Sequence, residues 1–173
     1  MYEQYLSMPS VPAGAILKRI LQKERITQKE IADKSDIYPQ RINELINGKR
    51  KFTPELSFKL EKALELSTQG YFYLIQTNYD IYSYQDEEER KHTPDLSKIN
   101  KALFWEAKIE KINWIRCAHN IIKRAFEYGD KMEIEEIIKF YGRKKVSEVL
   151  NAIPKTDTWK LRDRSKNRQL FEI

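Results

Sequence analysis

The sequence predicts an all-α protein built from two small helical domains. Apolar residues recur three and four positions apart along most of the chain, and residues that typically start or stop helices separate these stretches. With 173 residues, of which 40% are hydrophobic, the chain is long enough to bury two small cores. We expect one domain over residues 13–82 and a second over residues 98–173.

Residues 1–12, which include Pro9 and Pro12, are predicted to form an extended N-terminal arm. Such an arm either frays or docks on a partner. The next segment is predicted to be an amphipathic helix, because four apolar residues follow at helical spacing: Ile16, Leu17, Ile20 and Leu21.

A helical hairpin is predicted next, and its first helix should start at Thr27. The Thr27 hydroxyl can accept a hydrogen bond from the Glu30 backbone N–H, while the Glu30 carboxylate accepts one from the Thr27 N–H. A short polar break at Ser35-Asp36 follows. The second helix should begin near Tyr38, with Pro39 in the first turn, where the missing N–H of proline costs no hydrogen bond.

The second helix of this hairpin presents a polar outer face that suits DNA. Its inner face is predicted from three apolar residues, and Asn47-Gly48 should end it. Those apolar residues are Ile42, Leu45 and Ile46. The outward residues are Tyr38, Gln40, Arg41, Asn43 and Glu44. Gln and Asn can pair with adenine and Arg with guanine or phosphate, whereas the following Lys49-Arg50-Lys51 loop would add affinity without sequence information.

The alternative is an ordinary helical hairpin with a solvated outer face. We favour the DNA interpretation because the cap, the break, the proline start, the stop and the basic loop occur together at suitable offsets.

Two further helices are predicted to complete a five-helix bundle. One starts at Thr53-Pro54-Glu55 and buries a stripe of four residues. These are Leu56, Leu60, Ala63 and Leu64. The other begins at Ser67 and is rich in aromatic residues, which either cap the core or pair with a second copy of the same surface.

The stretch over residues 13–80 resembles the XRE-type helix-turn-helix family, and more narrowly the HigA-type antitoxins. The resemblance is carried by ITQKEIADKS, QRINELINGKR, FTPELSFKLEKALEL and YFYLIQTNYDI. It implies a lambda-repressor-like five-helix bundle that binds an operator in double-stranded DNA, as a homodimer. The turn departs from the family pattern, because Ser35 and Asp36 replace the usual apolar residue and glycine, although Asp36 can adopt the left-handed conformation.

The resemblance also implies site residues. Four residues should face the bases: Tyr38, Pro39, Gln40 and Asn43. Gln28 should touch a phosphate, and the residue chemistry adds four more backbone contacts. These are Arg41, Lys49, Arg50 and Lys51.

Residues 83–97 are predicted to be a polar, acidic linker, since they carry the acidic run Asp86–Glu89 and Pro94. The remainder is predicted to be helical over 97–107, 112–126, 130–141 and 146–153, with Asp130 as a cap and Gly129 and Gly142 as stops. The EYGD and FYG motifs, with LFW and INW, resemble a small helical domain of unknown function that follows such helix-turn-helix modules in bacterial proteins. Some of these proteins sit beside abortive-infection-type nucleotidyltransferase toxins.

No catalytic or metal-binding constellation is found in the sequence. Cys117 and His119 should point to different helix faces and are expected to fill the core, and the consecutive Glu135 and Glu136 should diverge. His92 lies in the predicted linker, and five glycines form no phosphate-binding loop. We therefore expect no enzyme activity, no cofactor and no bound metal.

The tail from Thr156 carries cations at alternate positions: Lys160, Arg162, Arg164, Lys166 and Arg168. They either follow a phosphate backbone or form a solvated basic tail, and Leu170-Phe171 is expected to dock.

Composition sets the remaining expectations. The net charge of +6 is compatible with a phosphate-bearing partner, and the single Cys117 excludes an intramolecular disulfide. With no apolar run of membrane-spanning length and no signal peptide, we expect a cytoplasmic protein without a membrane partner.

The sequence thus predicts a sequence-specific transcriptional regulator, the antitoxin of a toxin–antitoxin pair that represses its own operon and binds a cognate toxin. In the alternative hypothesis the helix-turn-helix is mainly a scaffold and the C-terminal domain neutralises the partner. A small nuclease is disfavoured by the missing acid, base and metal cluster.

Overall fold

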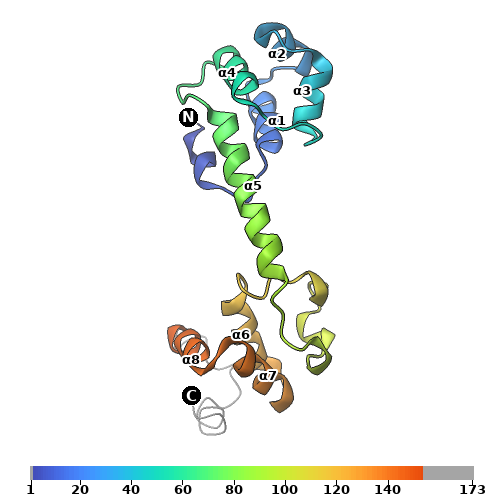
Figure 1. The fold of residues 1–173 in the computed structure, drawn as a ribbon, viewed down its shortest axis with the longest axis vertical. Helices are drawn as coiled ribbons and strands as arrows, with labels where there is room; N and C mark the ends of the chain where they lie inside the picture. Colours follow the sequence, from blue (N-terminus) through green and yellow to red (C-terminus); the bar gives the residue numbers. More distant parts are fainter. Residues whose placement is uncertain (1, 154–173) are drawn as a thin grey trace. The chain divides into compact units, whose positions relative to one another are not determined.

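The structure is a computed structural model, and it describes residues 2–153 (Figure 1). Within these residues the chain forms eight α-helices and four short 3-10 helices, with no strand. The predicted all-α fold is therefore confirmed. The chain divides into two compact units between Gln85 and Asp86, and each unit is described by itself.

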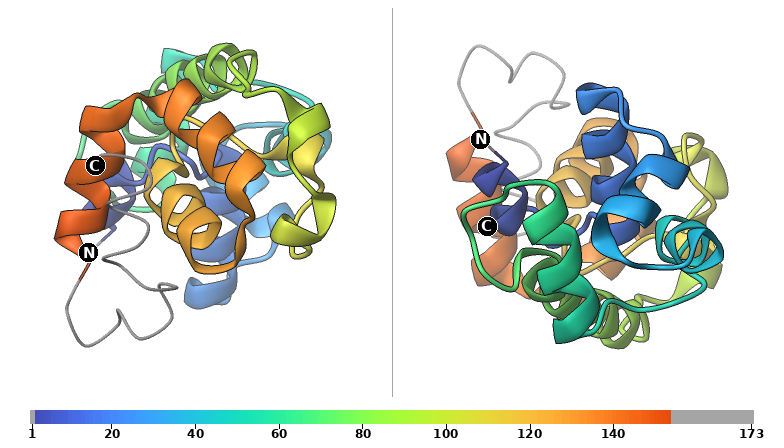
Figure 2. Two further views of the ribbon diagram at one scale, coloured as in Figure 1. Left: turned by 90° about the horizontal axis from the view of Figure 1, so that it is seen from below. Right: turned by 90° about the horizontal axis from the view of Figure 1, so that it is seen from above.

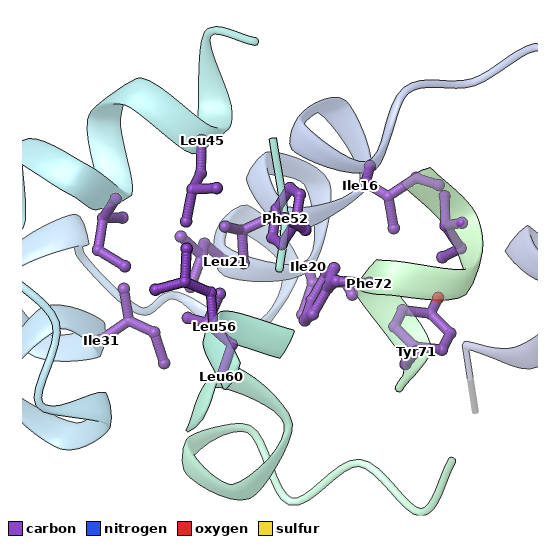
Figure 3. Packing of buried hydrophobic residues seen from close by; sticks show 14 of the residues in the cluster. Ile16, Ile20, Leu21, Ile31, Leu45, Phe52, Leu56, Leu60, Tyr71 and Phe72 are labelled. Carbon is purple, nitrogen blue, oxygen red and sulfur yellow. The ribbon is translucent and has the colours of Figure 1, made fainter. Parts of the chain in front are cut away.

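The first unit is a bundle of four short helices and one longer helix, coloured blue to green in Figure 2. The helices are α1 (Ala13–Glu24), α2 (Gln28–Ser35), α3 (Pro39–Ile46), α4 (Pro54–Ala63) and α5 (Tyr71–Arg90). Buried side chains from all five helices point toward one another in a single core (Figure 3). Among them are Ile16, Ile20, Leu21, Ile31, Leu45, Phe52, Leu56, Leu60, Tyr71 and Phe72.

Local signals fix both ends of α2 and the end of α3 as predicted, whereas α5 begins at Tyr71 and not at the predicted Ser67. Thr27 and Glu30 form a capping box, in which the Thr27 N–H donates to the Glu30 carboxylate over 2.7 Å. The hydrogen bond that the Thr27 backbone N–H donates to the Glu30 carboxylate also holds the pKa of that carboxyl below its usual range. Asp36 adopts the left-handed conformation with φ 51°, and Gly48 follows α3 with φ 69°.

The predicted extended arm is wrong. Residues Glu3–Ser7 form the 3-10 helix η1, and the rings of Tyr2 and Tyr5 are buried in the core of the first unit. The Tyr71 hydroxyl donates to the Tyr2 carbonyl over 2.8 Å. Burial of two large aromatic rings outweighs the tendency of a terminus to fray.

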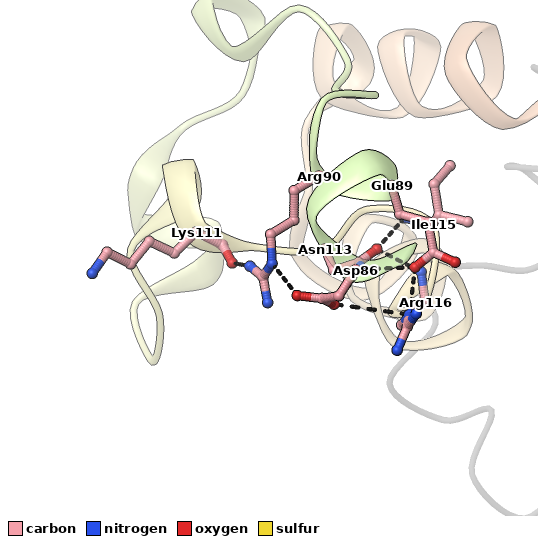
Figure 4. A network of polar contacts seen from close by, with 7 residues as sticks. All are labelled: Asp86, Glu89, Arg90, Lys111, Asn113, Ile115 and Arg116. Atoms are coloured by element: carbon pink, nitrogen blue, oxygen red, sulfur yellow. Dashed lines mark hydrogen bonds and ion pairs between the residues drawn. The ribbon is translucent and has the colours of Figure 1, made fainter. Parts of the chain in front are cut away.

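The predicted linker is also wrong over its first half, since α5 continues as a helix to Arg90. Asp86 and Glu89 both accept from the Asn113 side-chain amide, over 2.7 and 2.9 Å (Figure 4). Arg116 adds an ion pair to Glu89. Because residues three apart lie on one helix face, the acidic run becomes an anchor within the second unit instead of a solvated segment.

The second unit contains α6 (Ala118–Tyr128), α7 (Lys131–Tyr141) and α8 (Arg143–Ala152). The helix predicted over 97–107 is replaced by the 3-10 helices η2 (Leu96–Lys98) and η3 (Lys101–Phe104), and η4 (Ile109–Lys111) follows. Two buried carboxylates of α7 hold the backbone at the starts of η2 and η3. Glu136 accepts from the Asp95 N–H and Glu133 from the Asn100 N–H, each over 2.9 Å. These bonds fix the backbone in turns.

The core of the second unit surrounds Trp114, which is fully buried and packs edge-on against Phe104 and Phe140. The helix predicted over 112–126 begins only at Ala118. Cys117 and His119 therefore do not lie on the buried face of one continuous helix, as the prediction assumed. Both residues are exposed, and their predicted core role is wrong.

Other predictions for the second unit are confirmed. Asp130 and Glu133 form a capping box, and Gly142 ends α7 with φ 80°. Glu136 is buried whereas Glu135 is exposed, so the two carboxylates do diverge. The basic tail and Leu170-Phe171 lie outside the described residues. Across residues 2–153, no helix has both the length and the apolar character needed to cross a bilayer.

Candidate nucleic-acid interface

The position of α3 depends on a glycine that the sequence patterns did not single out. Gly14 lies in α1, where a Cβ atom would come within 2.2 Å of the Leu45 carbonyl oxygen and 2.9 Å of the Ile46 carbonyl oxygen. The backbone of α1 therefore packs directly on the C-terminal end of α3. A glycine inside an otherwise amphipathic helix was the available sequence signal.

All nine residues proposed to contact DNA are exposed in the structure. They are Gln28, Tyr38, Pro39, Gln40, Arg41, Asn43, Lys49, Arg50 and Lys51. Tyr38 precedes the first turn of α3 and is 74% exposed, while Ile42 and Leu45 on the opposite face are buried. The apolar stripe thus holds α3 in place and leaves its polar face open to a ligand.

A chain of side-chain amides links α3 to the start of α2. Asn47 Nδ2 donates to Asn43 Oδ1 over 3.1 Å, and Asn43 Nδ2 donates to Gln28 Oε1 over 3.3 Å. Because the Gln28 carbonyl oxygen is used by Asn43, its amide nitrogen remains as a donor suited to a phosphate oxygen. Asn47 was not among the predicted site residues.

Glu44 connects the predicted base-reading face to the basic loop. Its carboxylate accepts from Gln40 Nε2 over 3.2 Å and from Arg50 Nε over 2.8 Å. The bond from Arg50 holds the pKa of the Glu44 carboxyl below its usual range. The backbone N–H groups of Lys49 and Arg50 also donate to the Glu44 carbonyl, so the loop folds back on the end of α3.

Several cations of this surface already have partners within the chain. Lys51 pairs with Asp80 over 2.8 Å, and the Arg41 guanidinium lies 5.8 Å from the centre of the Tyr38 ring. Lys59, which was not predicted from the sequence, pairs with Asp36 over 3.4 Å beside the turn. Exposed ion pairs contribute about 0–1 kcal/mol each, so phosphate groups can compete for these cations.

The same surface offers nothing for a metal centre. Across residues 2–153 there is no group of three or more His, Cys, Asp or Glu side chains arranged to hold a metal ion. What the arrangement supplies is a set of amide, hydroxyl and cationic hydrogen-bond donors on one helix face and its flanking loop, which suits phosphates and base edges.

Comparisons with known proteins agree with this geometry. A helix-turn-helix family model matches residues 17–70, and a model for a family of unknown function matches residues 99–150. No solved structure matches the chain. The virulence-associated protein A′ of Dichelobacter nodosus is 31% identical over 81 residues, which is 47% of this chain and 70% of that protein. Residues 17–70 are therefore an XRE-type helix-turn-helix domain, and the chain belongs to the same family as this virulence-associated protein.

Proposed function

We propose that the chain is a sequence-specific transcriptional regulator of the bacterial cytoplasm, and that it is the antitoxin of a toxin–antitoxin pair. The observation that carries the DNA-binding part is the open face of α3. There Tyr38, Gln40 and Asn43 are exposed next to the Lys49–Lys51 loop. These side chains can contact base edges, while the loop neutralises phosphates on the flanking backbone.

We further propose that the regulator acts as a homodimer through α5. Four residues of this helix, spaced three, four and three positions apart, form one stripe within the first unit: Leu74, Thr77, Ile81 and Tyr84. Ile81 is 53% exposed and Tyr84 is 66% exposed, which is unusual for large apolar side chains on a helix. A two-fold dimer built on this stripe would present two α3 helices to a palindromic operator.

The antitoxin part of the proposal assigns partner binding to the second unit. Its support is the sequence resemblance to domains found beside toxins, together with the separate core of this unit around Trp114. In this proposal the first unit represses the operon and the second unit holds the toxin.

A quantitative gel shift with DNA from immediately upstream of the chain's own gene tests the regulator proposal. We expect binding roughly a thousandfold or more tighter than to a scrambled duplex at the same salt concentration. Equal affinity for both duplexes would reject it and favour the scaffold alternative. Co-purification with the product of the adjacent gene tests the antitoxin part separately.

A further inference from the structure

A groove in the second unit carries features of a ligand site. It lies between η3 with the residues after it and one face of α6, and its volume is about 620 Å³. Two large aromatic side chains line it and are unusually open to solvent: Trp105 is 74% exposed and Tyr128 is 59% exposed. Exposed tryptophan and tyrosine side chains beside a groove are typical of the centres of protein–protein interfaces.

The same groove contains a buried carboxylate with an unsatisfied oxygen. The Glu127 side chain is only 9% exposed, and its Oε1 atom has no hydrogen-bond partner. The Lys123 ammonium lies 4.0 Å from Oε1, which is too far for a hydrogen bond. A buried carboxylate oxygen without a donor costs free energy, so a ligand that supplies the donor gains affinity there.

On the Trp105 side of the groove, the cation Arg124 already has partners within the chain. Arg124 pairs with Glu106 over 3.2 Å, and its guanidinium lies 6.0 Å from the centre of the Trp105 ring. Trp105 is therefore already in contact range of one guanidinium. Glu127 is the member of the groove that still lacks a donor.

We propose that this groove binds an arginine side chain presented by a protein partner. The guanidinium would lie between Trp105 and Tyr128 and donate to the Glu127 carboxylate, while Lys123, which is 31% exposed, turns toward solvent. Arginine fits better than lysine because its planar group stacks on aromatic rings and donates two parallel bonds to a carboxylate. The inference deepens the partner-binding role proposed above for the second unit and rests on it.

The test is a titration of the full chain with N-acetyl-arginine amide, followed by the NMR signals of the tryptophan indole N–H groups. A Trp105→Phe variant assigns the Trp105 signal among the three tryptophans. We expect a saturable shift of that signal with a dissociation constant in the millimolar range, as befits one side chain. N-acetyl-citrulline amide, which is neutral but similar in shape, should bind at least fivefold more weakly, and N-acetyl-lysine amide should bind more weakly than arginine.

Matched variants locate the site. Glu127→Gln should weaken arginine binding at least tenfold, whereas Glu135→Gln, the same change at an exposed carboxylate on α7, should leave it within twofold. Tyr128→Ala, at an exposed position where folding is not at risk, should weaken binding severalfold. Equal binding of citrulline or lysine, unchanged binding by Glu127→Gln or by Tyr128→Ala, or a shift confined to another tryptophan would overturn the proposal. The titration needs neither DNA nor the partner, so its outcome is independent of the gel shift.

Discussion

The two units of the chain hold their backbone ends in different ways. In the first unit the caps of α2 and α4 are local, since Thr27 and Thr53 each accept from the backbone N–H three residues later. In the second unit the buried carboxylates Glu133 and Glu136 accept from backbone N–H groups 33 and 41 residues earlier in the chain. The starts of α2 and α4 therefore depend on signals within a single helical turn, whereas the starts of η2 and η3 also depend on contacts that form only when the chain folds back.

In the first unit, local caps bond the backbone at the starts of α2 and α4, and the polar face of α3 is exposed. The polar residues of α3 are left for a ligand. The second unit uses polar side chains to hold non-helical segments, and one carboxylate, Glu127, is left without a hydrogen bond at Oε1. The contrast suggests that the two units present different chemistry: donors and cations for DNA on the first, and an acceptor for a basic side chain on the second.

The largest effect is expected for Gly14→Ala in the first unit. The added methyl group would clash with backbone oxygens of α3, and overpacking against backbone should cost about 3 kcal/mol. Urea denaturation of the full chain should show a loss of stability confined to the first unit, and DNA affinity should fall as α3 is displaced. Ala15→Ser, at the exposed neighbouring position, serves as the control. If Gly14→Ala proved as stable as the control, close packing of α1 on α3 would be wrong.

A smaller effect is expected for Glu133→Ala in the second unit. This change leaves the backbone N–H groups of Asn100 and Asp130 without their acceptor and should cost about 2–3 kcal/mol. The local counterpart, Thr27→Ala, removes one cap and should cost about 1 kcal/mol. Urea denaturation monitored by circular dichroism measures both, with Glu135→Ala as the control. If Glu133→Ala and Thr27→Ala lowered the free energy of unfolding equally, long-range hydrogen bonds to the backbone would not stabilise the chain more than local caps do.

Removing cations from the first unit should weaken DNA binding more than removing cations from the second unit. Replacing the Lys49-Arg50-Lys51 loop by alanines should weaken binding to operator and scrambled DNA alike. It should also flatten the salt dependence of log K by about 0.9 for each phosphate that the loop no longer neutralises. The matched control replaces three exposed cations of the second unit by alanine: Lys108, Lys139 and Lys144. A control variant with the same flattening of the salt dependence would argue against a DNA-binding role specific to the first unit.

The smallest effect is expected for Asp86→Asn, which should change how the stability of the chain falls at acid pH. Hydrogen bonds from Arg90 and Arg116 hold the pKa values of Asp86 and Glu89 below their usual range. Such carboxyls bind fewer protons in the folded chain than in the unfolded chain. Their stabilisation is therefore present above the ordinary pKa, near 4, and is lost as the pH falls through the lowered value. Urea denaturation over a pH series should show a shallower acid decline for Asp86→Asn than for wild type; an equally steep decline would exclude this network as a source.

The sequence allowed most of the first unit to be predicted for a physical reason. A capping box, a proline in the first turn and a glycine after the last turn each act over three or four residues, so Thr27, Pro39 and Gly48 are readable in the chain itself. The orientation of Gln28 and Gln40 was not readable. It depends on Asn43, bound across two helices, and on Glu44, which Arg50 also holds.

The second unit was predicted less well because its signals are long-range. Apolar spacing around Leu103 and Ile115 suggested α-helices, but the carboxylates of α7 stabilise 3-10 turns instead, and α6 starts only at Ala118. The acidic run at Asp86–Glu89 looked solvated because its partner, Asn113, lies more than twenty residues away. Nothing in the local sequence could show that pairing.

The most direct measurement compares the operator and a scrambled duplex for wild type and for the Gln40→Ala, Asn43→Ala double variant at physiological salt. Removing each side chain that reads a base should cost about 1–3 kcal/mol of operator affinity, while affinity for scrambled DNA should stay nearly constant. The specificity ratio should therefore collapse in the variant. An unchanged ratio would contradict the account, because the open face of α3 would then not be what reads the sequence.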